Sequence, residues 1–276
     1  MSKLKEKIGL IIGGGRAPKI IIDQLLKDKE DFFVIALSGH TSPSSVNSKI
    51  NHEWVNLGQI KKTFDLLKKH NISYVSFIGS VTRPSLSNIK PDTEASLFLL
   101  KMGFKKFVGG DDKLLSSLMD LFEQKGFHIL PATSISSSMK VEKGILGKIA
   151  PKKHEIKDIE AGANILDLIS SADIGQSLII EKGYVLGVEA AEGTQNLIKR
   201  CKSLKKEQNK CGVLVKIKKK NQDIRIDLPS IGVKTIDAVK NAGLSGIAIQ
   251  SEYSIIIDKE KVIKKANESN IFLVGI

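Results

Sequence analysis

The sequence predicts an α/β protein with an N-terminal Rossmann-like parallel sheet domain and a C-terminal mixed α/β domain. Two observations carry this prediction. Short apolar segments alternate with amphipathic helical segments through the first half, which is typical of a parallel, doubly wound sheet. In the second half, the turn Glu181–Gly183 joins two apolar segments, which predicts a β-hairpin.

The N-terminal domain is expected to span residues 1–134. Each expected strand is a short apolar run, and each expected helix shows the 3.6-residue period. The expected strands are Ile8–Ile12, Phe32–Leu37, Tyr74–Ile78 and Phe127–Leu130. The expected helices are Pro18–Lys27, Ile60–His70 and a segment from Gly110 to Lys125, which Asp111 or Asp112 caps and Gly126 closes.

Residues 135–156 are predicted to form an interdomain linker, because serine, glycine and proline interrupt every periodic pattern there. The C-terminal mixed α/β domain is expected over residues 157–276. Its expected helices are Lys157–Ser171, Val233–Ala242 and Lys259–Ser269, the last capped by Asp258. Its expected strands are Ser177–Ile180, Tyr184–Val188, Gly212–Ile217, Ile247–Ile249 and Ile271–Val274.

Composition limits the function classes. The chain has 276 residues, 41% of them hydrophobic, and no apolar run approaches the roughly 20 residues that span a bilayer. A net charge of +13 favours anionic partners, although a lysine-rich solvated surface would account for it too. Aromatic residues make up only 5%, which argues against single-stranded nucleic acid as a partner. Cys201 and Cys211 form no disulfide framework, which fits a reducing cytoplasm.

The strongest candidate site lies where Asp223, Arg225 and Asp227 alternate with apolar residues before Pro229. An extended segment would place these three side chains on one face. Carboxylates suit Mg²⁺, and a guanidinium pairs with phosphate oxygens. The alternative is a solvent-facing strand edge with a surface ion pair, which contributes little to stability.

A second acidic group follows the expected strand that ends at Val188. Glu189 and Glu192 would complete a Mg²⁺ shell with the two aspartates, and Thr194 would hydrogen-bond a phosphate. The alternative is the first turn of a helix, where glutamate favours the helix dipole. Gln176 follows an expected helix end and is either a ligand or a loop-structuring group.

In the first half, Gly13, Gly14 and Gly15 follow a strand and open a helix, where backbone N–H groups receive phosphate; a tight turn without ligand is the alternative. Gly79 ends another expected strand, and Arg83 lies four residues beyond it as a phosphate partner; an exposed loop arginine is the alternative. Neither a complete dinucleotide fingerprint nor a P-loop is present.

Several blocks resemble a family of UDP-2,3-diacylglucosamine pyrophosphatases that serves lipid A biosynthesis where the metallophosphoesterase type is lacking. The blocks follow the family's order and lie at Gly13–Gly15, Leu57–Gln59, Gly79–Pro84, Gly109–Leu115, Asp173–Gln176, Val188–Thr194 and Gln222–Gly232. Two departures are Gln195, where the family usually carries Asp, and Lys220-Asn221 in place of Pro-Gly.

The resemblance implies Mg²⁺-dependent hydrolysis of UDP-2,3-diacylglucosamine to UMP and 2,3-diacylglucosamine 1-phosphate (lipid X), by water attack on the sugar-side phosphorus. It implies catalytic roles for Asp223, Arg225 and Asp227, and adds Asp111 to the substrate-binding residues. It also implies a cytoplasmic homodimer, no nucleic-acid partner, peripheral contact with the inner membrane and an apolar chamber between the domains for the acyl chains.

Two other classes of protein remain open from the sequence. One is a nucleotide-sugar or NAD-linked enzyme that uses the N-terminal sheet, although the glycine pattern is incomplete. The other is a non-catalytic basic protein that binds nucleic acid or anionic lipid, for which a steep salt dependence of binding would be expected.

Overall fold

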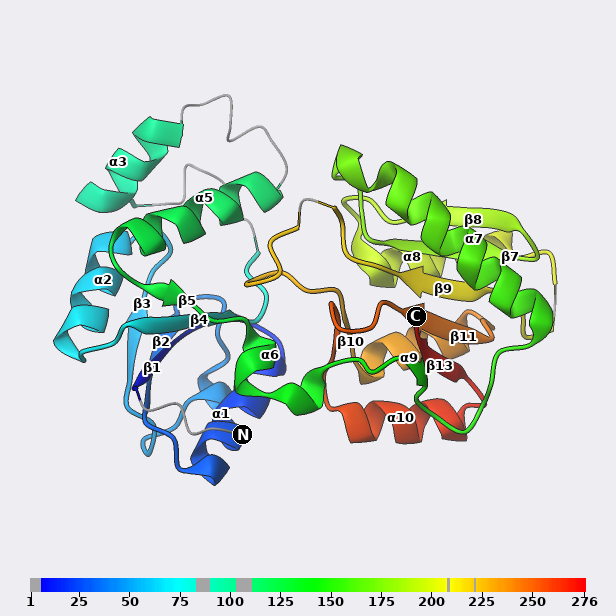
Figure 1. Cartoon of the computed structure of the whole chain (residues 1–276), viewed down its shortest axis with the longest axis horizontal. Helices are drawn as coiled ribbons and strands as arrows, with labels where there is room; N and C mark the ends of the chain where they lie inside the picture. The colour runs from blue at the N-terminus through cyan, green and yellow to red at the C-terminus, as the bar shows by residue number, and fades with distance from the viewer. Residues whose placement is uncertain (1–5, 83–89, 103–110, 208, 221) are drawn as a thin grey trace. The chain divides into compact units, whose positions relative to one another are not determined.

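The computed structural model describes residues 6–82, 90–102, 111–207, 209–220 and 222–276, with the backbone alone for Met102 and residues 111–113. The chain forms two compact units, Met1–Ser136 and Ser137–Ile276, each with its own main sheet (Figure 1). Helices and strands alternate along both units, so the predicted α/β class is confirmed.

The sheet of unit 1 is fully parallel, with strand order β3-β2-β1-β4-β5. This is the order of the first five strands in dinucleotide-binding sheets, in which the order reverses beside β1. Every residue of β1 is buried, because the strand has a neighbour on either side and helices on both faces. The strands are β1 Ile8–Ile12, β2 Phe32–Leu37, β3 His52–Val55, β4 Tyr74–Ile78 and β5 His128–Ile129.

Helices cover both faces of this sheet, with α1 and α6 on one side and α2, α3 and α5 on the other (Figure 1). The connections to β2 and to β4 run in opposite directions along the sheet, so right-handed crossovers place α1 and α2 on opposite faces. Phe64 of α2 and Phe122 of α5 pack with ring centroids 4.8 Å apart. The helices are α1 Ala17–Asp28, η1 Pro43–Ser45, α2 Ile60–Lys69, α3 Thr93–Met102, α5 Asp111–Gln124 and α6 Ala132–Ile135.

The main sheet of unit 2 is mixed, with strand order β6-β13-β11-β9-β7-β8. Its centre, β13-β11-β9, is parallel, whereas β7, β8 and β6 each run antiparallel to their neighbours. A separate two-stranded sheet pairs β10 with β12. The strands are β6 Gly144–Ile145, β7 Ser177–Glu181, β8 Tyr184–Val188, β9 Val213–Lys216, β10 Ser230–Ile231, β11 Gly246–Ile249, β12 Ile255–Ile256 and β13 Phe272–Gly275.

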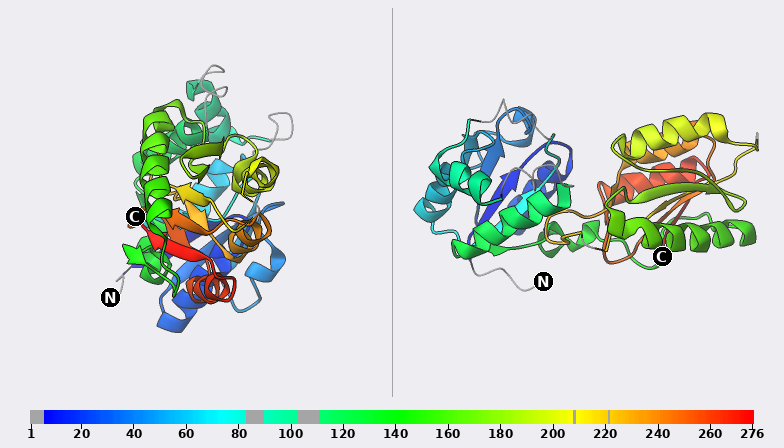
Figure 2. Two further views of the ribbon diagram at one scale, coloured as in Figure 1. Left: turned by 90° about the vertical axis from the view of Figure 1, so that its right-hand side faces the viewer. Right: turned by 90° about the horizontal axis from the view of Figure 1, so that it is seen from above.

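Side chains alternate between two apolar layers of unit 2. Leu214 and Ile247 pack toward α8, α9 and α10, while Val215 and Ala248 pack toward α7, and the right panel of Figure 2 shows these helices on opposite faces. The helices are α7 Lys153–Ile169, η4 Ser170–Ala172, α8 Gly193–Cys201, η5 Lys202–Leu204, α9 Val233–Asn241 and α10 Lys259–Glu268, with η3 Ser137–Met139 before β6.

The predicted hairpin is confirmed as β7-β8. Lys182 and Gly183 both adopt left-handed backbone angles, φ 48° and 83°, as a type I′ turn requires. The carboxylate of Asp158 accepts both turn N–H groups, at 2.8 and 2.7 Å. The turn is therefore held by α7 as well as by its own backbone preference.

Three features differ from the sequence expectation. The elements that were not expected include the edge strand β3, the two-residue strands β6, β10 and β12, and the helices α3 and α6. The segment expected as a linker belongs largely to unit 2, because β6 pairs with β13 and Val141 is buried in the core at 1% exposure. Asp258 is the N-cap residue of α10, but its side chain makes no capping hydrogen bond.

Candidate functional site

A polar cluster forms at one end of the unit 2 sheet because three strand ends meet there. The register pairs Ser177, the first residue of β7, with Lys216, the last residue of β9. It also pairs Leu178 with Val188, the last residue of β8. Antiparallel pairing thus gathers the residues that begin β7, follow β8 and end β9.

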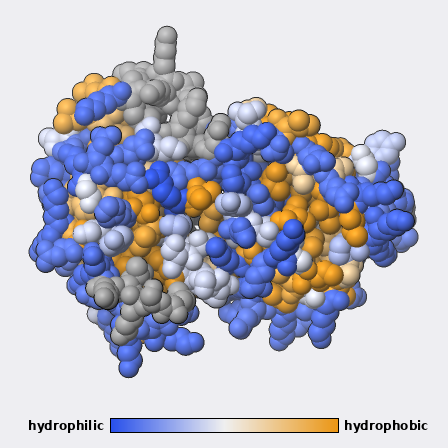
Figure 3. Space-filling view, viewed as in Figure 1, coloured by the Kyte–Doolittle hydropathy of each residue, from blue (hydrophilic) through white to orange (hydrophobic). Residues whose placement is uncertain are grey.

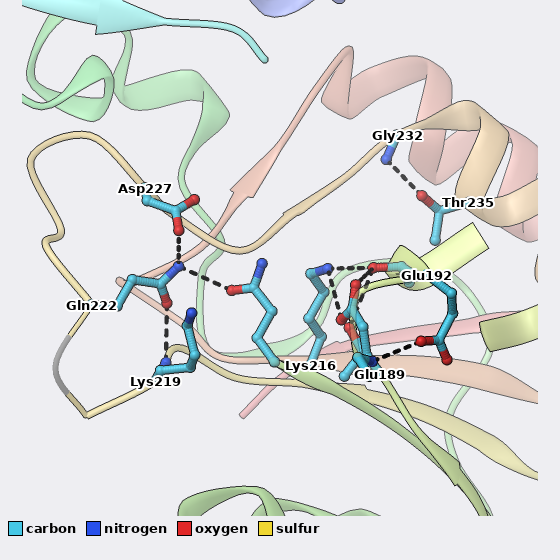
Figure 4. A network of polar contacts seen from close by, with 12 residues as sticks. Glu189, Glu192, Lys216, Lys219, Gln222, Asp227, Gly232 and Thr235 are labelled. Carbon is cyan, nitrogen blue, oxygen red and sulfur yellow. Dashed lines mark hydrogen bonds and ion pairs between the residues drawn. The ribbon is translucent and has the colours of Figure 1, made fainter. Parts of the chain in front are cut away.

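Lys216, Thr194 and Glu189 form a hydrogen-bonded chain in this cluster (Figure 4). The Lys216 ammonium donates to Thr194 Oγ1 at 2.8 Å, and Thr194 Oγ1 donates to Glu189 Oε1 at 2.8 Å. Glu189 Oε2 is buried without a hydrogen-bond partner among the described residues and lies 3.9 Å from Lys216 Nζ. The three side chains come from β9, α8 and the end of β8.

Burial is the main influence on the pKa of Lys216, because its side chain is only 4% exposed. Loss of solvation lowers the pKa of Lys216, and the opposing charges of Glu189 and Asp227 raise it in part. A buried ammonium is costly unless a carboxylate compensates it, so the charge of Lys216 depends on the neighbouring Glu189.

Gln222 connects the acidic loop to this end of the sheet. Its side-chain N–H₂ group donates to Asp227 Oδ2 at 2.5 Å and to Gln176 Oε1 at 3.1 Å, and its oxygen accepts from the Lys219 backbone N–H at 3.0 Å. The backbone carbonyl of Gln176 in turn accepts a hydrogen bond from the N–H of Ile217, next to Lys216. Asp227, Gln176 and Lys216 thus belong to adjoining parts of one polar network.

The expected extended segment at Asp223–Asp227 is wrong, because these residues form a turn. The Asp223 carbonyl accepts from the N–H groups of Ile226 and Asp227, at 3.2 and 3.0 Å. The Asp223 carboxylate accepts the Arg225 backbone N–H at 3.0 Å and its guanidinium Nε–H at 2.9 Å. Aspartate commonly forms such turns, and here they override the alternating pattern, leaving Ile224 43% exposed.

The pair of Asp223 and Arg225 is an ion pair inside the turn. Hydrogen bonds from the Arg225 guanidinium hold the pKa of Asp223 below its ordinary value, although partial burial opposes this. Asp223 is therefore ionised, and Arg225 is engaged with it. The structure brings these two predicted residues together, but it does not place Asp223, Arg225 and Asp227 on one strand face.

The four predicted metal ligands do not converge. Glu192 is the N-cap residue of α8 and pairs with Arg200 at 2.8 Å, which also lowers the pKa of Glu192. Asp223 pairs with Arg225, and Glu189 faces Lys216. Among the described residues, no three His, Cys, Asp or Glu side chains gather to hold a metal ion.

Asp227 is the carboxylate that best fits Mg²⁺. Of its two oxygens, Oδ2 accepts the Gln222 amide, and the other accepts no hydrogen bond from the described residues. Mg²⁺ is commonly held by one or two carboxylates together with waters and substrate phosphates, so a dedicated protein cage is not required. The ammonium of Lys216 beside Glu189 argues against a direct cation contact there, since like charges repel.

The glycine turn of unit 1 serves the chain itself at two of its three positions. Gly13 N–H donates to the Ile78 carbonyl at 2.8 Å, and Gly14 N–H donates to the Ser80 carbonyl at 2.7 Å. A Cβ at Gly79, whose φ is 97°, would lie 2.4 Å from the Gly14 carbonyl oxygen. Gly15 has φ 87° and open space around its Cα, so it is the predicted position that leaves room for a ligand.

Two further predicted residues lie outside this description. Arg83 is not among the described residues, and only the backbone of Asp111, at the start of α5, is described.

Sequence reasoning missed Lys216 and the side-chain role of Gln222. The signal for Lys216 was a lysine that directly follows the apolar run Val213–Val215, but the surrounding lysine-rich stretch concealed it.

Comparisons with known proteins cover the whole length of the chain. A family model for the LpxI N-terminal domain matches residues 7–139, and one for the LpxI C-terminal domain matches residues 142–274. UDP-2,3-diacylglucosamine pyrophosphatase LpxI of Caulobacter vibrioides is 34% identical over 278 residues, covering 98% of each chain.

Solved structures give weaker likenesses. UDP-glucose 4-epimerase from Thermus thermophilus, in complex with NAD, is 14% identical with a TM-score of 0.30, and the match covers 53% of this chain and 41% of that one. N5-carboxyaminoimidazole synthetase from Staphylococcus aureus is 15% identical with a TM-score of 0.24, covering 76% of this chain and 46% of that one. This chain therefore spans less than half of either protein, and neither likeness bears on function.

Proposed function

The chain belongs to the LpxI family, and from that membership we propose that it hydrolyses the pyrophosphate of UDP-2,3-diacylglucosamine to UMP and 2,3-diacylglucosamine 1-phosphate. The observation that carries the proposal is the relative named for this activity, which aligns with 98% of the chain at 34% identity. The polar network of unit 2 supports it, because two blocks that resemble the family, Val188–Thr194 and Gln222–Gly232, both contribute to that network.

In the proposed reaction, water attacks the sugar-side phosphorus, and UMP leaves with the electrons of the broken P–O bond. Asp227 and Asp223 are the carboxylates that orient this water and accept its proton. Arg225 keeps Asp223 ionised and fixed in the turn, since its guanidinium Nε lies 2.9 Å from Asp223 Oδ1. A preorganised charge of this kind needs no rearrangement when the reaction occurs.

Mg²⁺ is part of the proposal. Asp227 would hold the ion together with phosphate oxygens of the substrate, and the ion would supply positive charge to the pyrophosphate. Gln222 keeps the Asp227 carboxylate oriented by donating to one of its oxygens. In unit 1, we propose that Gly15 and the carboxyl ends of β1 and β4 receive the nucleotide, because sheets of this strand order bind ligands there.

We further propose that the enzyme acts in the cytoplasm as a homodimer that contacts the inner membrane to reach its acylated substrate. Exposed apolar side chains on unit 2 support a lipid contact: Leu168 of α7 is 75% exposed and Tyr184 of β8 is 63% exposed. Apolar patches also lie among polar ones on the side of unit 2 seen in Figure 3. Within the described part of the chain, no helix has the length and apolar character to cross a bilayer.

The test is to incubate the purified protein with UDP-2,3-diacylglucosamine, with Mg²⁺ or with EDTA, and to separate the products by chromatography. UMP formation that requires Mg²⁺ is expected. In ¹⁸O-labelled water, the label should enter 2,3-diacylglucosamine 1-phosphate and not UMP, because attack is at the sugar-side phosphorus. A protein that releases no UMP under these conditions would refute the proposed activity, and label in UMP would refute the direction of attack.

A further inference from the structure

Lys216 has an unusual position for a lysine. It ends β9, which lies between β11 and β7 in the sheet, and its side chain is 4% exposed. The three residues before it, Val213–Val215, are fully buried apolar residues. Burying an ammonium carries a large desolvation cost, so an apolar residue would fill this position at lower cost if packing were all that mattered.

The hydrogen bonds of Lys216 fix the orientation of its neighbours. An ammonium group only donates, so Thr194 Oγ1 must accept from Lys216 and place its own proton toward Glu189. Thr194 is thereby held from both sides, and Glu189 is held through Oε1. With Lys216 removed, the Thr194 hydroxyl would keep Glu189 and Ser177 as neighbours but lose the ammonium donor, and Glu189 would lose the positive charge that lies 3.9 Å from Oε2.

Lys216 also links the two acidic parts of the network. Glu189 follows β8 and faces Lys216, and Asp227 lies in the loop after β9. The N–H of Ile217, next to Lys216, donates to the backbone carbonyl of Gln176, and the Gln222 side chain donates to both Gln176 and Asp227. The backbone reinforces this link, because Glu189 N–H donates to the Ser177 carbonyl and Ser177 is the register partner of Lys216. Lys216 and the residue that follows it thus connect to groups that lie 38 residues apart in the chain, at 189 and 227.

We propose that Lys216 is a positioning residue for the hydrolysis: it fixes Thr194 and Glu189 at the end of the sheet. This inference rests on the proposed function. Lys216 does not itself touch the substrate, since its side chain is buried, and it acts through the groups that it holds. Its loss should therefore lower kcat and leave KM nearly unchanged.

The test uses Lys216→Met, which keeps the length and apolar stem of the side chain and removes its charge. We expect kcat to fall by about 10- to 100-fold, as for other groups that orient a functional residue, with KM changed by less than roughly threefold. Lys220→Met is the matched control, because Lys220 is exposed and pairs with Asp167 at the surface. That control should keep the wild-type kcat.

Thr194→Val is a second variant that tests the inference independently in case Lys216→Met does not fold. It is nearly isosteric and removes the hydroxyl between Lys216 and Glu189. A loss of kcat in Thr194→Val, and a double variant no slower than the slower single variant, would support the inference, because residues that act as a unit are not additive. Wild-type kcat in either folded single variant, or losses that multiply in the double variant, would overturn it.

The outcomes separate this inference from the proposed function. An inactive wild-type protein would refute the proposed hydrolysis, and the positioning role with it. An active wild-type protein combined with a fully active Lys216→Met variant would overturn the positioning role and leave the hydrolysis intact. Thermal melting of every variant shows which of them is folded, so a loss of kcat in a folded protein is assigned to the site.

Discussion

The Asp223 carboxylate has two proposed roles, one in the hydrolysis and one in stabilising the turn, and Asp223→Asn tests both. In the structure this carboxylate accepts the Arg225 backbone N–H at 3.0 Å and the guanidinium Nε–H at 2.9 Å, and its side chain is 12% exposed. Asparagine keeps the volume and one acceptor oxygen but loses the charge. We expect kcat for UMP release to fall by roughly 100-fold or more, because a group that orients or deprotonates water is lost.

The same substitution should lower the free energy of unfolding. Hydrogen bonds to charged groups contribute about 1.5–3 kcal/mol, and since Arg225 is 28% exposed we expect the lower part of that range, about 1.5 kcal/mol. Urea unfolding at pH 7, followed by circular dichroism, measures this loss. Asp227→Asn is the control, because asparagine keeps an oxygen that can accept the one hydrogen bond from the Gln222 amide. It should lose a comparable share of kcat and only about 0.5–1 kcal/mol of stability.

The result that would contradict this reasoning is Asp223→Asn with wild-type kcat and reduced stability. Asp223 would then only shape the turn, and its ion pair with Arg225 would be structural. A variant with reduced kcat and unchanged stability would instead show that the Arg225 hydrogen bonds contribute little to folding, as exposed ion pairs often do.

Three further predictions concern stability. Arg225 lowers the folded-state pKa of Asp223, so the ionised carboxylate contributes its full stabilisation above the unfolded-state pKa of about 3.9. The difference in unfolding free energy between wild type and Asp223→Asn should therefore shrink as pH falls below about 4, as measured by urea titrations. Gly175→Ala would place a Cβ 2.1 Å from the Glu189 carbonyl oxygen, so it should lower both the melting temperature and kcat, and a melting curve like wild type would contradict it. Gly79→Ala, with φ 97° and a Cβ 2.4 Å from the Gly14 carbonyl oxygen, should cost at least about 2 kcal/mol in urea unfolding.

Much of the fold follows from local sequence patterns. The bounds of β1, β2 and β4 agree with the predicted strands because each is a short, mostly apolar and largely buried run. The turn at Lys182-Gly183 is similarly local, since a two-residue hairpin needs left-handed angles that glycine provides. Such elements require no knowledge of distant partners, which is why a single sequence predicts them.

Elements whose stability comes from distant partners were not predicted. β3 reads His-Glu-Trp-Val and has one neighbouring strand, so its polar residues face solvent and the apolar signal disappears. β6 is only two residues long, and its pairing with β13 crosses most of unit 2 in sequence. The segment around Val141 therefore looked like a linker, although Val141 is buried in the core.

In the candidate site, too, local sequence patterns predicted some features, and features that depend on distant partners were missed. The blocks containing Glu189, Thr194 and Asp227 were identified from the sequence, but their mutual arrangement depends on the order β9-β7-β8, which no local pattern records. Lys216 enters the site only through that order, since its register partner Ser177 lies 39 positions earlier in the chain. A lysine in a chain with 43 basic residues gives no signal of burial by itself.

The four predicted metal ligands are separated in the structure for a related physical reason. A sequence shows where carboxylates lie, but not which cation each of them meets in the folded chain. In unit 2, Glu192 meets Arg200, Asp223 meets Arg225 and Glu189 faces Lys216. A carboxylate already paired with a cation must give up that interaction before it binds a metal ion, which lowers its effective affinity. Asp227 accepts a hydrogen bond from the neutral amide of Gln222, so we propose that the chemistry of Mg²⁺ and the pyrophosphate centres on this residue.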